Sequence, residues 1–262
     1  MAATTLTPGR VHERRSLTVL RRPAVLRLTS SIGSAVICGI VVGGIGGRIV
    51  MRVSAAAADE SRIGMLTENG NVIGRITVEG TMALLLFVGL ITGVSVGLFL
   101  FALRAVLPGR FLPATISAVL LALGGAIAID PSNADFVIVG NRALNVAMFI
   151  ALFPAFGVLF VVLAERVDRW LVEPPLARIA PLSLIGTGLG VVLGLLGVGV
   201  ITASNGLPTA IAIVAVTALG AVAAFASEAL AVPARRAALV VLTMATAWGL
   251  IQVAEDVRTI VG

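Results

Sequence analysis

Seven long apolar runs divide this chain, and they constrain its fold more than any other feature of the sequence. A helix needs about 20 apolar residues to cross the hydrocarbon layer of a bilayer, because lipid offers the backbone no hydrogen-bonding partner. Most of the runs reach this length, and short loops separate them. They cover residues 30–57, 81–102, 112–129, 144–164, 182–203, 207–231 and 237–253. The sequence therefore predicts an all-α integral membrane protein, folded as a single bundle of about seven transmembrane helices.

The composition agrees with this fold class. Apolar residues make up 58% of the chain, charged residues only 12%, and the mean hydropathy is +1.10, unlike a soluble domain. Seven spans leave no room in 262 residues for a separate soluble domain. We therefore expect a basic arm over residues 1–29 and a transmembrane bundle over residues 30–262. All 19 basic residues are Arg, which together with abundant Ala, Gly and Val is typical of a GC-rich bacterium.

The arginines predict the orientation of the bundle. The N-terminal arm and the loops after spans two, four and six hold thirteen arginines and five acids, whereas the alternate segments hold six arginines and eight acids. Cytoplasmic loops carry an excess of arginine, so we expect a cytoplasmic N-terminus and an extracytoplasmic C-terminus in the cell membrane. The net charge of +6 is explained by these membrane-flanking loops, and we expect no nucleic-acid partner.

The N-terminal arm has a second interpretation. Arg14-Arg15-Ser16-Leu17 loosely resembles a twin-arginine export signal, and the alanines at 55–57 offer a small-residue cleavage site. A retained first span is favoured over this interpretation, because further arginines at 21, 22 and 27 intervene before the apolar run and Arg48 interrupts its far end.

Glycines four residues apart predict close helix packing. Residues i and i+4 share a helix face, so such a series makes a groove in which another backbone can lie closely. We expect packing within the bundle, with homo-oligomerisation through one exposed groove as the alternative. The series are Gly39, Gly43 and Gly47; Gly89, Gly93 and Gly97; and Gly186, Gly190 and Gly194.

The loop between the first two spans is the largest extracytoplasmic segment. Its Glu68-Asn69-Gly70 sequence accepts the positive φ angles of a tight turn, and β-favouring residues flank it. A small β-hairpin-like cap over the outer face is predicted, and a plain solvated loop is the alternative.

Missing side chains exclude several kinds of chemistry. Without Lys the chain can form neither a retinal Schiff base nor a P-loop. The single histidine, His12, and the single cysteine, Cys38, provide no metal, haem or disulfide site. Serines in the spans have no histidine partner, and carboxylates are the only remaining acid–base groups. We therefore expect no catalytic residues, no metal and no cofactor.

Two arginines near the outer end of the first span are expected to have carboxylate partners. Arg48 and Arg52 are one helical turn apart, and an unpaired charge at this depth is costly. We expect Arg48 to point into the bundle and pair with Glu79 or Asp130. Two interpretations follow: ion pairs that fasten the helix ends, or an outward-facing vestibule that binds an anion, a headgroup or a partner protein. The candidate ligand-binding residues are Arg48, Arg52, Glu79, Asp130, Asp135 and Arg142.

Two functional hypotheses follow from these features. The first is a non-enzymatic accessory or scaffold component, whose partners are the bilayer and other membrane proteins or further copies of the chain. The second is a small secondary transporter or channel. It draws support from a faint resemblance between the segment from Phe101 to Pro108 and that from Phe225 to Pro233, which suggests a three-plus-one-plus-three repeat. Few polar residues lie deep in the spans, which favours the first hypothesis.

Overall fold

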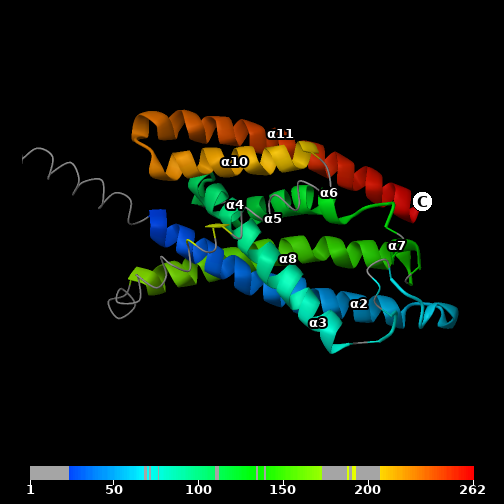
Figure 1. Ribbon diagram of the computed structural model, residues 1–262. Helices are drawn as coiled ribbons and strands as arrows, with labels where there is room; N and C mark the ends of the chain where they lie inside the picture. The colour runs from blue at the N-terminus through cyan, green and yellow to red at the C-terminus, as the bar shows by residue number, and fades with distance from the viewer. Residues whose placement is uncertain are drawn as a thin grey trace, which may run out of the picture.

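The computed structural model describes residues 24–67, 70, 72–75, 77–109, 112–133, 135–138, 140–172, 188, 191–192 and 207–262. These residues are mostly helical (Figure 1). Five of their helices are long and apolar enough to cross a membrane, and a shorter apolar helix runs over Leu112–Ala128. The predicted all-α fold is therefore confirmed for the described part of the chain. The basic arm up to residue 23, most of the run 182–203 and the glycines at 186, 190 and 194 lie outside it.

The first long helix covers Ala24–Ala56. It contains the π-helical segment η1 (Gly39–Gly46) and continues as α2 (Gly47–Ala56). It is already helical at Ala24, the first described residue, so Arg27 belongs to the helix and not to the basic arm.

The second long helix covers Val78–Val106. Thr77 caps its start by accepting a hydrogen bond from the backbone N–H of Gly80 at 3.2 Å. It ends before Pro108, because a proline drives the preceding residue to extended backbone and Leu107 has ψ of 146°. Its segments are α3 (Val78–Ala83), the π-helical η3 (Leu84–Ile91) and α4 (Thr92–Val106).

The first two long helices pack through backbone at their glycines. A Cβ added at Gly39 would collide with the carbonyl oxygen of Gly89. A Cβ at Gly93 would lie 2.9 Å from the carbonyl oxygen of Ala35. Backbones approach this closely only where no side chain separates them, so glycine is required at these positions.

The other glycines of the two series pack less uniformly. A Cβ at Gly97 would lie 2.8 Å from the Cα of Ile32, again a backbone contact. Gly43 instead faces a side-chain carbon of Val88 at 3.1 Å, and Gly47 has only one side-chain neighbour at 3.6 Å. The contact therefore loosens toward the far end of the first helix.

The remaining helices complete the bundle. Pro113 and Pro208 lie in the first turn of their helices, where the backbone N–H groups make no hydrogen bonds within the helix, so the lack of an N–H in proline costs nothing there. The helices are α5 (Leu112–Val119), the π-helical η5 (Leu120–Gly124), α6 (Gly125–Ala128), α7 (Asp135–Ile138), α8 (Arg142–Val172), α10 (Leu207–Phe225) and α11 (Glu228–Val261).

The boundary between the last two spans differs from the prediction. The turn lies at Ala226 and Ser227, not between residues 231 and 237, and Pro233 and Arg235 lie inside α11. A transmembrane helix tolerates an internal proline, because neighbouring groups satisfy the freed carbonyl. The two segments behind the suggested repeat occupy different positions in their helices, since Phe101 lies inside α4 whereas Phe225 ends α10.

The helix α4 lies at the centre of the packing. It contacts α5, α10, α11 and η1. Leu100 and Leu103 of α4 are fully buried, as are Ile116 of α5 and Phe160 of α8 in the same apolar cluster. Large apolar side chains such as Ile49, Phe87 and Met244 are instead exposed on the outside of the bundle, as expected of a surface that faces lipid.

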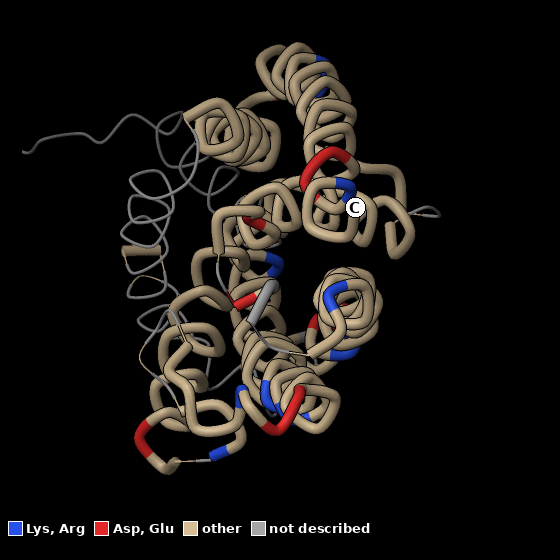
Figure 2. Tube along the Cα trace, turned by 90° about the vertical axis from the view of Figure 1, so that its right-hand side faces the viewer, with Lys and Arg blue, Asp and Glu red and all other residues tan. Residues whose placement is uncertain are grey.

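From the first long helix to α8 the helices run in alternate directions, whereas α10 runs in the same direction as α8 and α11 runs opposite to α10 (Figure 1). The two termini of the described part therefore lie at opposite ends of the bundle. Ala24, the end of α4 and the end of α8 lie at what we call the N-terminal end. The end of α2, the start of α8 and Gly262 lie at the C-terminal end. Figure 2 views the C-terminal end, where arginine and acidic segments interrupt a trace that is otherwise mostly uncharged.

The loop between the first two long helices contains one antiparallel bridge, between Leu66 and Val72. Gly70 has φ of 73°, the left-handed conformation expected of the predicted turn. The backbone N–H of Ile73 also bonds the carbonyl of Met65 at 2.8 Å. The described residues of the loop form no strand longer than this bridge.

Candidate functional site

A cavity of about 270 Å³ opens at the C-terminal end of the bundle, and we call it the Arg48 cavity. Residues from α2, the first loop, α7 and the start of α8 form its walls. The lining residues are Arg48, Met51, Arg52, Ser54, Ala55, Thr67, Val72, Ile73, Gly74, Arg75, Ala128, Asn133, Asp135, Phe136, Asn145 and Phe149.

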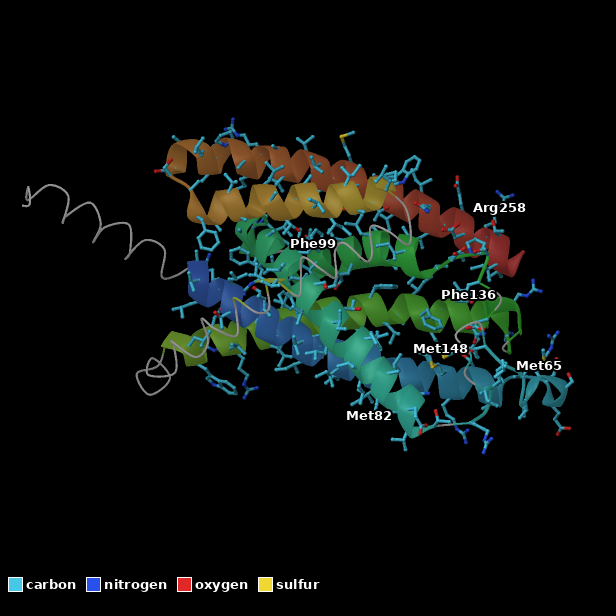
Figure 3. All side chains as sticks on the ribbon, in the orientation of Figure 1. Met65, Met82, Phe99, Phe136, Met148 and Arg258 are labelled. Carbon is cyan, nitrogen blue, oxygen red and sulfur yellow. The ribbon has the colours of Figure 1, made fainter. Side chains whose placement is uncertain are left out.

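Local backbone geometry brings the loop before α8 onto the end of α2. Gly140 has φ of 62°, and a Cβ there would lie 2.6 Å from the carbonyl oxygen of Ser54. A larger residue would be strained in this conformation and would push the two segments apart. Phe136, which is labelled in Figure 3, is buried beside Phe149 with ring centroids 5.6 Å apart. These contacts position one wall of the cavity.

Arg48 is the most unusual side chain of the cavity. It is half-buried on α2, and its Nε atom is buried without a hydrogen-bond partner among the described residues. Arg52 lies one turn further along the same helix and is exposed. A buried donor without a partner costs about 1–3 kcal/mol, so an acceptor that reached Arg48 would gain binding energy there.

The prediction that Arg48 pairs with Glu79 or Asp130 is wrong. Among the described residues neither carboxylate makes an ion pair with it. Glu79 lies exposed in the first turn of α3. Asp130 accepts hydrogen bonds from the backbone N–H and the hydroxyl of Ser132, at 2.8 and 2.7 Å. This local turn satisfies Asp130 within its own loop.

The structure brings together three of the six candidate ligand-binding residues. Arg48, Arg52 and Asp135 line the Arg48 cavity, whereas Glu79, Asp130 and Arg142 do not. Arg142 is exposed at the first residue of α8.

Sequence reasoning missed five polar residues of the cavity, among them Ser54 and Thr67. Arg75, Asn133 and Asn145 also line it. Asn145 is buried. Arg75 belongs to the predicted hairpin, whose position relative to α2 cannot be read from its own sequence.

The charges and walls of the Arg48 cavity favour an anion with an apolar body. Three arginines line it, and Asp135 is the one carboxylate among the described lining residues. Met51, Ile73 and Phe149 supply apolar surface beside the arginines. Arginine binds carboxylate and phosphate groups through paired N–H donors, so a ligand with such a group and a hydrocarbon part matches both features.

A second polar cluster lies at the N-terminal end. Arg104 of α4 forms an ion pair with Asp168 of α8, and its Nη1 atom donates to the hydroxyls of Ser30 and Ser31, each at 3.1 Å. Ser30 also donates to the Asp168 carboxylate. We call these four residues the Arg104 network.

The ionic partner of Arg104 is Asp168, a residue that the sequence analysis did not identify. Asp168 did not stand out because the predicted span ended at residue 164, whereas α8 continues through Asp168 to Val172.

Within the described ranges, no three His, Cys, Asp or Glu side chains are close enough to hold a metal ion. Comparisons of the chain with protein-family models, with curated proteins and with solved structures found no match.

Proposed function

We propose that the chain is a non-enzymatic membrane component that binds an amphipathic anion in the Arg48 cavity. The observation that supports this most is the buried, unpartnered Nε of Arg48 in a cavity with three arginines and one described carboxylate. A carboxylate or phosphate on the ligand would complete the hydrogen bonds of Arg48, while its hydrocarbon part would contact Met51 and Phe149. As an accessory or scaffold protein, the chain would present this ligand to another membrane protein or to a further copy of itself.

We further propose seven spans in the cell membrane, with a cytoplasmic N-terminus. Arg27, Arg104, Asp168 and Arg235 line one cavity at the N-terminal end, which agrees with the arginine-rich segments lying on one side. In addition, α8 ends at the N-terminal end and α10 begins at the C-terminal end (Figure 1). The end of α8 and the start of α10 therefore lie at opposite ends of the bundle, which agrees with a further span between them.

Reporter fusions at helix ends test this topology. Fusions after Gly109, Ser227 and the arm residue Gly9 are expected to report the cytoplasm, and fusions after Asn133 and Gly262 the outside, because the arginine excess sets orientation. The measurement is the paired activity of a reporter active only outside and one active only inside. An inside signal from Gly262 would contradict the seven-span arrangement.

Replacing Arg48 tests the ligand site. The Arg48→Gln variant is expected to bind dodecyl phosphate roughly 10- to 100-fold more weakly than the original chain, because a charge-assisted hydrogen bond contributes about 1.5–3 kcal/mol. Binding would be measured by calorimetry on the full chain in a neutral maltoside detergent. Dodecyl trimethylammonium, which has the same chain and the opposite charge, should not bind in the cavity.

The matched control is Arg258→Gln. Arg258 is exposed at the same end of the bundle and does not line the cavity (Figure 3). Its replacement removes the same charge, so equal losses from both variants would mean that only the overall field attracts the anion. The proposal also fails if Arg48→Gln binds dodecyl phosphate as tightly as the original chain.

A small secondary transporter is the second candidate. The observation in its favour is that each end of the bundle has a cavity lined by arginines, the Arg48 cavity at one end and the cavity lined by Arg104 at the other. Uptake of labelled dodecyl phosphate into proteoliposomes, reduced by Arg48→Gln, would favour transport over a purely accessory role.

A further inference from the structure

A second cavity, of about 580 Å³, lies at the N-terminal end, and we call it the Arg235 cavity. The start of the first helix, the end of α4, the turn after it, the start of α5, the end of α8 and the first turns of α11 surround it. Its polar side chains are Arg27, Arg104, Asp168 and Arg235. It is separate from the Arg48 cavity, with which it shares no lining residue.

The charge in the Arg235 cavity is unbalanced. Asp168 is already paired with Arg104 and accepts from Ser30, so this pair contributes no net charge. Arg27 and Arg235 are exposed, and among the described residues neither forms an ion pair. Two positive charges from helices distant in sequence therefore face one cavity without a carboxylate of their own.

The neutral part of the lining is apolar. Leu107 and Leu112 lie on either side of the turn after α4, and Leu239 lies one helical turn after Arg235 on the same face of α11. The cavity thus joins two arginines to hydrocarbon surface at the end of a bundle whose outer side chains are apolar. Basic pockets between transmembrane helices on the cytoplasmic side suit anionic lipid headgroups.

We propose that the Arg235 cavity binds the phosphate group of an anionic phospholipid of the inner leaflet. The phosphate lies between Arg27 and Arg235, and an acyl chain lies against Leu112 and Leu239. The Arg104 network forms the neutral floor of the site, because its arginine is held by Asp168 and by the two serines. This site is independent of any ligand in the Arg48 cavity.

The test is lipid binding to the full chain in maltoside detergent, with dihexanoyl phosphatidylglycerol as the probe and dihexanoyl phosphatidylcholine as the zwitterionic comparison. The original chain is expected to bind phosphatidylglycerol roughly tenfold or more tightly than phosphatidylcholine. The Arg27→Gln/Arg235→Gln double variant should lose this preference. Each single variant should bind phosphatidylglycerol roughly fivefold more weakly, because the interaction of one arginine with a lipid phosphate changes the affinity by about this factor.

Arg236→Gln is the control, because Arg236 is exposed on the next position of α11 and does not line the cavity. It removes one of the same charges and should leave binding unchanged. Both Arg27 and Arg235 are exposed, so their variants should keep the unfolding free energy of the original chain, which a denaturation curve checks.

Three results would overturn the proposal. Equal affinities for phosphatidylglycerol and phosphatidylcholine would show that the site does not recognise the anionic headgroup. An equal loss from Arg236→Gln would show that surface charge and not the cavity attracts the lipid. Inorganic phosphate that competes with phosphatidylglycerol at equal affinity would show that the site takes a free anion and not a lipid.

Discussion

Replacing Asp168 by Ala is expected to lower the free energy of unfolding by about 3 kcal/mol, because the change leaves Arg104 in a mostly buried position without its ionic partner. The side chain of Arg104 is only 10% exposed, so water cannot replace the lost carboxylate fully. Ser30 and Ser31 would still accept hydrogen bonds from Arg104, but neither carries a charge. The measurement is unfolding of the maltoside-solubilised chain by titration with dodecyl sulfate.

The control for Asp168 is Glu165→Ala, three residues earlier on α8 at an exposed position. It removes an acid from the same helix and should change the unfolding free energy by less than about 0.5 kcal/mol. A double variant, Arg104→Leu with Asp168→Leu, should recover much of the loss, because an apolar pair replaces a buried ion pair at little cost. Equal effects of Asp168→Ala and Glu165→Ala would show that the ion pair does not stabilise the bundle.

Gly39→Leu is expected to destabilise the bundle by about 3 kcal/mol, the upper part of the range for overpacking. The added Cβ would collide with the carbonyl oxygen of Gly89, and it would also lie 3.2 Å from the Cα of Gly93. These are backbone atoms, which cannot move aside as a side chain does, so the first two long helices would separate. The same dodecyl sulfate titration measures the loss.

Gly33→Leu on the same helix is the matched control for Gly39→Leu. A Cβ at Gly33 would meet nothing within 4 Å, so its replacement should not destabilise the chain. Gly43→Leu should fall between the two, since its nearest neighbour is a side-chain carbon of Val88. A stable Gly39→Leu variant would mean that the two helices do not pack along this face.

The helices themselves were predictable because the free energy of placing a span in lipid is a sum over neighbouring residues. Four of the predicted runs, at 30–57, 81–102, 112–129 and 144–164, correspond to helices of the described chain. The predicted boundary near residues 231–237 was wrong, because the tertiary structure accommodates Pro233 inside α11.

The candidate site was only partly predictable. The position of Arg48 and Arg52 on one helix face follows from their spacing of four residues. The partners of Arg48 do not follow from the sequence, because they depend on how far each loop reaches and on the rotation of each helix about its axis. Asp130 accepts its hydrogen bonds from Ser132, two residues away. Arg75 reaches the cavity from a loop whose position in space the sequence does not give.

The sequence by itself therefore determined the helical class, the glycines at which helices can approach and the segments in which arginine gathers. Each of these depends on residues that are close together in the chain. Only the tertiary structure decided that Gly39 meets Gly89, that Arg104 pairs with Asp168, and that Arg48 lies in a cavity without a carboxylate partner. These pairings join different helices, and packing of the whole bundle sets the rotation and depth of each helix.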